Sequence, residues 1–172
     1  TLRWYQVAWE SSWFTNSVVT SGAVAALATL GSLAGGTLAA YVICRSGVRG
    51  RAAFEYLMMA PLIVPSVTIG FAIFNTALLL GTQDLSFLNL VLGHAVITLP
   101  LTLRSVSASM LGLNLHIEEA AQSLGASPWV AFWKVTLPSI LPGLVGAAII
   151  AFTFSFNDVA VAAFLIGPTT RT

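Results

Sequence analysis

The sequence predicts an all-α fold, a polytopic bundle of transmembrane helices. Of its 172 residues, 57% are hydrophobic and only 8% are charged, and the mean hydropathy is +0.90. In a soluble domain about a quarter of the residues are charged. No charged residue occurs between Glu10 and Arg45, and about 20 apolar residues suffice to cross a bilayer. Lipid offers the backbone no hydrogen-bond partner, so the spanning segments are expected to be helices.

Four spans are expected, at about residues 16–43, 56–80, 85–103 and 138–160. The first contains glycines among Ala and Ser, which lets neighbouring helices approach closely. The second contains Pro61 and Pro65, and the third contains Pro100. Each proline removes one helical hydrogen bond, so kinks are expected there. The fourth span belongs to an apolar stretch that continues to Ile166 and is interrupted by Asp158.

The positive charges predict which side of the membrane each loop faces. Short cytoplasmic loops carry an excess of Lys and Arg. Arg3 and Arg171 lie on one side of the predicted topology. The other side has five basic residues, namely Arg45, Arg49, Arg51, Arg104 and Lys134. The polar segment 105–137 is therefore expected in the cytoplasm.

Residues 1–172 are interpreted as a single transmembrane domain. The chain begins with Thr1 and stops at Thr172, shortly after a Gly-Pro pair. We therefore expect a fragment that lacks both termini of the full protein.

The segment between the last two spans contains the start and stop signals of two short helices joined by a turn. Asn114 is a candidate N-cap of the first helix, and Gly125 is placed to end it. Ser127 followed by Pro128 is typical of a new helix start. Apolar residues recur at helical spacing in the first helix, at Ile117, Ala120, Ala121 and Leu124. On this pattern alone, an amphipathic connector lying on the membrane surface is an equal alternative.

The spacing of particular residues in this segment matches a known motif. Glu119-Ala120-Ala121 is followed by Gly125 and then by Val135-Thr136-Leu137-Pro138. This arrangement resembles the EAA loop of binding-protein-dependent ABC transporter permeases, with Val135 where the family usually has isoleucine. The resemblance implies the type I ABC importer permease fold, which is MetI-like, with a cytoplasmic coupling helix that lies in a groove of an ATPase. The residues to which it assigns ATPase coupling are Glu118, Glu119, Ala120, Ala121, Leu124, Gly125 and Pro138.

The same resemblance implies a set of partners and a location. The partners are a cytoplasmic ATP-binding subunit dimer, a second permease subunit, and a periplasmic or extracellular substrate-binding protein. The location is the bacterial inner membrane, where the chain is surrounded by lipid. Because the sequence contains no Gly-rich phosphate-binding loop with Lys and Ser or Thr, ATP hydrolysis is expected on a separate subunit. The chain itself is not expected to be an enzyme.

Other stretches resemble the spermidine/putrescine branch of these permeases. They include Leu2-Arg3-Trp4-Tyr5, Asn16-Ser17, Leu99-Pro100 before Arg104, Phe154 to Asp158, and Phe164 to Pro168. A small cation is therefore the expected substrate, with Asn157 and Asp158 as candidate pathway residues. Asn157 replaces an acid of the branch, so iron, thiamine, sulfate or another anion stays an alternative. Asp158 is also about 30 Å along a helix from Pro138, which would bring it to headgroup water.

The composition excludes several other classes of function. Seven basic and six acidic residues give a net charge of +1 without a basic stripe, so nucleic-acid binding has no electrostatic support. Cys44 is the single cysteine, and no metal or other cofactor is expected. An intramembrane hydrolase would need a pair such as Ser66 and His94, and a secondary transporter would need internal repeats. Neither alternative finds support, and His94 is expected to be a packed or hydrogen-bonded residue.

Overall fold

The computed structural model describes residues 2–45 and 49–167, and all the regular structure in these ranges is helical. The prediction of an all-α fold is confirmed. Thr1, Pro168, Arg171 and Thr172 lie outside the described residues. The elements in chain order are α1 (Arg3–Glu10), α2 (Ser12–Arg45), α3 (Arg51–Met59), the 3-10 turn η1 (Ala60–Leu62), α4 (Ser66–Leu80), the 3-10 turn η2 (Gln83–Leu85), α5 (Ser86–Leu111), α6 (Leu115–Ser123), α7 (Pro128–Ala131), the π-helical turn η3 (Phe132–Thr136), α8 (Leu137–Asn157) and α9 (Ala162–Leu165).

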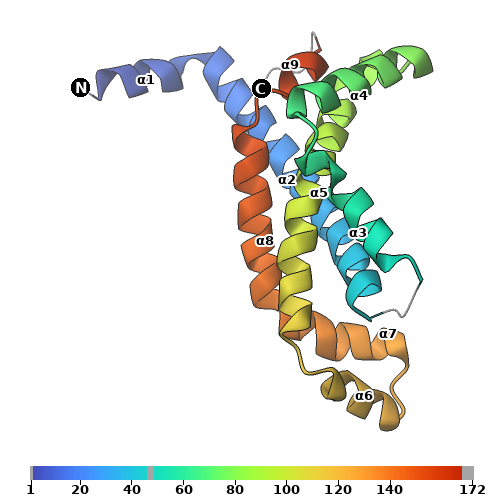
Figure 1. Cartoon of the computed structure of the whole chain (residues 1–172). Helices are drawn as coiled ribbons and strands as arrows, with labels where there is room; N and C mark the ends of the chain where they lie inside the picture. The colour runs from blue at the N-terminus through green and yellow to red at the C-terminus, as the bar shows by residue number, and fades with distance from the viewer. Residues whose placement is uncertain (1, 46–48, 168–172) are drawn as a thin grey trace.

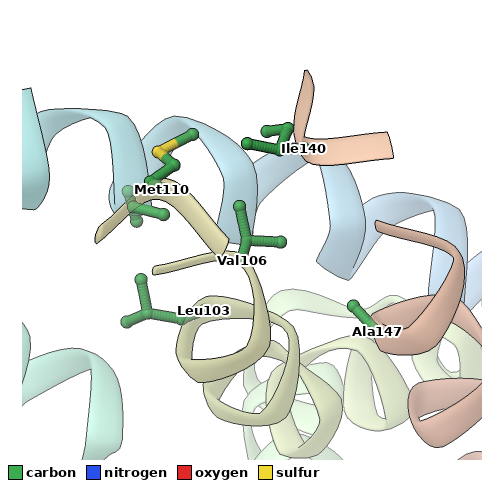
Figure 2. Close-up of a cluster of buried hydrophobic side chains, with 7 residues drawn as sticks. Leu103, Val106, Met110, Ile140 and Ala147 are labelled. Carbon is green, nitrogen blue, oxygen red and sulfur yellow. The ribbon is translucent and has the colours of Figure 1, made fainter. Parts of the chain in front are cut away.

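Helices α2, α5 and α8 pack side by side and form the centre of the molecule (Figure 1). Three helical stretches in the described part of the chain are long and apolar enough to cross a membrane, namely Ser12–Arg45, Gln83–Leu111 and Pro128–Asn157. They contain the expected spans 16–43 and 85–103 and most of 138–160. Figure 2 shows the buried core that joins the three helices. Its buried members are Ala39, Ala40, Leu103, Val106, Met110, Ile140 and Ala147.

Small residues set the close approach of α2 and α5. A Cβ added at Gly36 would collide with the side chain of Thr102 and would lie 3.1 Å from the backbone nitrogen of Leu103. The Thr102 hydroxyl donates a hydrogen bond of 2.8 Å to the carbonyl oxygen of Ser32. Without a hydrophobic driving force in lipid, such contacts between small residues hold membrane helices together. The glycine-rich composition of the first span thus has the predicted consequence at Gly36.

The segment expected as one span at 56–80 consists of two helical parts bent by 96°. The first part is α3 with η1, the second is α4, and residues 63–65 join them. A proline disfavours helical backbone at the residue before it and has no N–H of its own, and Pro65 itself has a non-helical ψ of 134°, so one helix ends before it and the next begins after it. The bend is a break, not the kink that the prolines predicted. Pro100, in contrast, lies inside α5 without ending it.

The chain turns back at the C-terminal end of α8, which lies opposite to α6 and is called the outer end below (Figure 1). This helix ends at Asn157, and Asp158 has an extended backbone with φ −81° and ψ 117°, so the apolar stretch to Ile166 is not one continuous helix. The returning segment, which includes α9, packs onto α4 and α5. A second buried cluster forms there from Val24, Leu90, Ile97, Val161, Ala162 and Leu165. The glycines Gly70 and Gly93 leave room for Val161.

The two ends of the bundle differ in charge and composition. Helix α1 lies across the end of α2 opposite to α6 (Figure 1), and exposes Trp4, Tyr5 and Trp9, the residue types that gather at membrane interfaces. Arg45 and Lys134 lie in the elements at the α6 end. Arg3 and the segment 112–137 thus lie at opposite ends of the bundle (Figure 1), while residues 105–111 of the expected loop belong to α5. Which end faces the cytoplasm stays a prediction.

Candidate functional site: the segment 114–138 and the outer hollows

Two caps shape the helix α6. The Asn114 side chain accepts a hydrogen bond of 3.0 Å from the His116 backbone N–H. At the other end Gly125 has a φ of +94°, and its N–H bonds to the carbonyl of Gln122 at 2.9 Å while Ala126 N–H bonds to that of Ala121 at 3.1 Å. This pair of bonds is the Schellman motif, in which a glycine takes the left-handed position. The predicted start and end of the first helix are confirmed.

Ser127 is the N-cap of the second helix, α7, as predicted. The Ser127 hydroxyl accepts a hydrogen bond of 3.3 Å from Val130 N–H, and Pro128 occupies the first turn. The helix then widens into η3, where Leu137 N–H bonds to the carbonyl of Phe132, five residues earlier. Pro138 follows and has no N–H for the carbonyl of Lys134, which is a local reason for a π turn just before it. Sequence periodicity did not predict this widening.

Most of the predicted coupling residues lie on the surface. Leu124 is 90% exposed, and Ala120, Gly125 and Pro138 are exposed as well, while Ala121 is half-buried. The Glu119 carboxylate is exposed and lies 3.1 Å from Nδ1 of His116. The apolar stripe of α6 therefore faces outward and does not pack on the bundle. Trp129, on α7, adds another exposed apolar side chain to this end.

Glu118 is the exception among the predicted coupling residues, because its side chain points into the protein. It is 7% exposed. Oε1 accepts a hydrogen bond of 3.2 Å from the Tyr41 hydroxyl, and Oε2 accepts one of 3.0 Å from the Thr136 hydroxyl. Arg45 Nε lies 3.4 Å from Oε2 and forms an ion pair with it, but the angle at the N–H is not that of a hydrogen bond. Sequence reasoning missed these contacts, since Tyr41 lies 77 residues before Glu118.

Aromatic rings fix the α7–η3 segment to the end of α2. The rings of Tyr41 and Phe132 meet edge to face with centroids 5.1 Å apart. Phe132 also contacts Trp129 at 6.2 Å and Trp133 at 5.7 Å. Such aromatic pairs add to the stability that burial provides. Tyr41 thus contributes its ring to this cluster and its hydroxyl to Glu118.

The two predicted pathway residues lie beside an open hollow at the outer end of α8. Its volume is about 530 Å³, and its lining residues are Ile149, Ile150, Thr153, Phe154, Asn157 and Asp158. Asp158 is half-buried, and its Oδ1 accepts a hydrogen bond of 2.9 Å from Val161 N–H. It therefore caps the turn that leads to α9. The exposed amide of Asn157 donates to the carbonyl of Thr153 at 2.7 Å.

A second hollow lies at the break between α3 and α4. Its volume is about 260 Å³, and it is lined by residues 61–66 together with Ile97 and Phe154. Phe154 thus belongs to both hollows. Ile63 is 84% exposed there. Irregular backbone at membrane depth is tolerated only where protein covers it or where it lines a water-filled cavity.

His94 is buried and bonded, as its interpretation as a structural residue predicts. Its Nδ1 lies 3.0 Å from the Ser155 hydroxyl, and both residues are 3% exposed. Ser66 instead lines the hollow at the break, so the Ser66–His94 pair of the hydrolase alternative is not formed among the described residues. The same residues include no group of three His, Cys, Asp or Glu side chains that would hold a metal ion.

Residues 12–171 match the family of inner membrane components of binding-protein-dependent transport systems. The chain belongs to this family. An inner membrane component of this kind is the permease of the transport system and does not itself catalyse a reaction. The identification that rested on Glu119, Ala120, Ala121 and Gly125 is confirmed, and so is the inner-membrane location. The matched range contains the whole segment 114–138.

Named relatives of this inner membrane component transport different solutes. It is 32% identical to the putrescine transport system permease protein PotI of Escherichia coli K12 over 172 residues, which cover 96% of this chain and 61% of PotI. It is 30% identical to the molybdenum transport system permease protein ModB of the same strain, over 83% of this chain and 67% of ModB. Identity to its spermidine/putrescine transport system permease protein PotC is 26%, over 98% of this chain and 63% of PotC. The chain thus spans less than two thirds of the length of PotI and PotC.

Proposed function

We propose that this chain is the transmembrane permease subunit of an ABC importer and that it couples to a cytoplasmic ATP-binding subunit dimer through the segment 114–138. The observation that carries the proposal is the outward apolar stripe of α6, held between the Asn114 cap and the Gly125 turn. A short amphipathic helix with an unpacked apolar stripe is suited to a groove on another protein. Ala120 and Ala121 allow close approach, and Leu124 supplies an apolar anchor.

The charges of α6 support the same docking mode. Glu119 is exposed next to the apolar stripe, where its side chain contacts the exposed His116 of the same helix, so its carboxylate remains accessible to a basic side chain at the rim of the groove. Rim charges of this kind mainly steer association and fix its orientation. A membrane surface, the alternative partner of an amphipathic helix, would instead favour basic residues. The exposed carboxylate of Glu119, beside the apolar stripe, opposes that alternative.

The two hollows support a translocation pathway shared with a second permease subunit. The first hollow has walls from α8 and Asp158 only, and the second exposes the irregular backbone at 63–65. In the membrane, the second hollow needs a partner or water at its irregular backbone, and the first needs one at the Asp158 carboxylate. A second permease subunit facing this side would complete the pathway, and an external binding protein would deliver the substrate to it.

A small cation such as a polyamine is the proposed substrate. The stretches around Arg3-Trp4-Tyr5 and Asp158 resemble the spermidine/putrescine branch, and PotI and PotC are named for these solutes. Asp158 supplies one negative charge beside the larger hollow. A molybdenum permease at 30% identity, and Asn157 in place of an acid, keep an anion as the second candidate.

Co-purification tests the proposed coupling. The full-length protein, expressed together with its ATP-binding subunit, should retain that subunit through purification in detergent. Leu124→Asp should release it, because the 90% exposed Leu124 is free of packing in this chain and a buried charge in the groove is costly. Glu10→Gln, an exposed change at the opposite end, is the control. Retention of the subunit by Leu124→Asp, or transport that needs no ATPase, would contradict the proposal.

A further inference from the structure

Two neighbouring acids in α6 have opposite environments. The Glu119 side chain is 69% exposed and contacts His116 of its own helix. The Glu118 side chain is 10% exposed and contacts residues of α2 and η3. Successive residues of an α-helix point about 100° apart, so α6 directs one carboxylate to the surface and the other to the bundle. The two carboxylates therefore perform different tasks.

The contacts of Glu118 join three parts of the fold at one carboxylate. Tyr41 and Arg45 lie one turn apart on α2, so Glu118 contacts a single face of the last turns of that helix. Thr136 lies in η3, directly before α8. Helix α6 itself packs chiefly against η3 and α7. The side chain of Glu118 consequently gives α6 a polar connection to α2 in addition to its connection to α8.

We infer that Glu118 is a positioning residue that connects the coupling segment to α2, so that a displacement of α6 is followed by α2. A carboxylate removed from water is costly unless it is paired and hydrogen-bonded, and here one ion pair and two hydroxyl donors satisfy it. Such directed contacts restrict the position of α6 relative to α2 in addition to the aromatic contact between Tyr41 and Phe132. The inference rests on the proposed coupling, because it says how motion at the ATPase reaches the bundle.

A distance measurement without the ATPase tests the positioning role. Nitroxide labels are placed at the exposed Leu38→Cys of α2 and Gln122→Cys of α6, in full-length protein with Cys44→Ser, reconstituted in nanodiscs. Glu118→Gln should broaden the distance distribution measured by electron-electron resonance, whereas Glu119→Gln should leave it at the parental width. An unchanged distribution in Glu118→Gln overturns the inference. This outcome does not depend on whether an ATPase binds.

Two further variants separate the contacts and guard against misfolding. Thr136→Val removes one hydrogen bond but keeps the ion pair, so it should give an intermediate width even if Glu118→Gln does not fold. Arg45→Gln combined with Glu118→Gln should broaden the distribution no more than Glu118→Gln alone, because residues that act as a unit have non-additive effects. Fully additive broadening would show that the two residues act separately and would overturn the inference.

The same label pair tests transmission in the assembled transporter. With the ATP-binding subunits, ATP and vanadate, the mean distance should stay constant in the parental protein because α2 follows α6. In Glu118→Gln it should shift, because α6 then moves without α2. An equal shift in both proteins would overturn the transmission role. Failure of the subunits to bind even the parental protein would instead contradict the proposed function.

Discussion

The hydroxyl of Thr102 in α5 donates a 2.8 Å hydrogen bond to the carbonyl oxygen of Ser32 in α2. Ser32 lies within α2, so the bond from Thr102 connects the two helices in addition to the hydrogen bonds within each helix. It forms because Gly36, one turn beyond Ser32, has no side chain in the space that Thr102 occupies. Both Ser32 and Thr102 are fully buried. One residue without a side chain thus permits both the close packing and the hydrogen bond.

Gly36→Leu is therefore expected to separate α2 from α5. Overpacking at a closely packed site costs roughly 1–3 kcal/mol of the free energy of unfolding, and the thermal unfolding temperature in detergent should fall. Gly22→Leu is the matched control, since nothing lies within 4 Å of a Cβ at Gly22. Equal unfolding temperatures for the two variants would contradict the packing described here.

Gly125→Ala is expected to disturb the turn between α6 and α7. A left-handed backbone costs a residue with a Cβ about 1–2 kcal/mol, and Gly125 has a φ of +94°. The strain should displace α6 and weaken retention of the ATP-binding subunit in co-purification. Gly125→Asn should be milder, because asparagine also occurs at this helix position. The control is Gly112→Ala, at a φ of −75°; a loss of the subunit in that variant as well would point to a cause other than strain.

Cysteines at the α3–α4 break should react with a charged, membrane-impermeant thiol reagent. Ile63→Cys and Val64→Cys are placed in a Cys44→Ser background, and labelling is followed by mass spectrometry in intact membranes. The reactive species is the thiolate, which forms in a water-lined hollow but not in hydrocarbon. Leu30→Cys, exposed in the middle of α2, is the lipid-facing control and should not react. If positions 63 and 64 are as unreactive as position 30, the break does not line an aqueous pathway.

Asp158→Asn separates the charge of this residue from its capping bond. Asparagine keeps an oxygen for Val161 N–H and is itself a good cap, so thermal stability should stay near the parental value. Uptake of labelled putrescine by proteoliposomes should fall, because the negative charge beside the hollow is lost. Asp158→Ala should lose uptake and also stability, by about 1 kcal/mol. Asp84→Asn, an exposed change at the same end, is the control, and parental uptake by Asp158→Asn would refute the cation-attracting role.

Features that depend on neighbouring residues were predictable from the sequence. Asn114, Gly125 and Ser127 act on backbone groups within four residues of themselves. Their roles therefore follow from the chemistry of these residue types and their spacing. The same holds for the long apolar helices, because composition and length suffice to predict them.

Features that depend on distant residues were not predictable in the same way. The sequence around Glu118 and Glu119 does not distinguish the two acids, because Tyr41, Arg45 and Thr136 decide which one is buried. Hydrophobicity is continuous through residues 61–65, so it indicates an apolar segment but not the 96° change of direction. Prolines predicted that the helix would be disturbed there, and only the packing of α4 shows by how much.

The length of α2 gives it the geometry of a lever. Its 34 residues extend for about 51 Å at 1.5 Å per residue, whereas the hydrocarbon core is about 30 Å thick. A rigid rod that pivots near its middle moves each end by about 4 Å when it tilts by about 10°. Arg45 is the last residue of this rod. A tilt of this size within the bilayer would therefore displace the end of α2 that contacts α6 by most of the rise of one helical turn, about 5.4 Å.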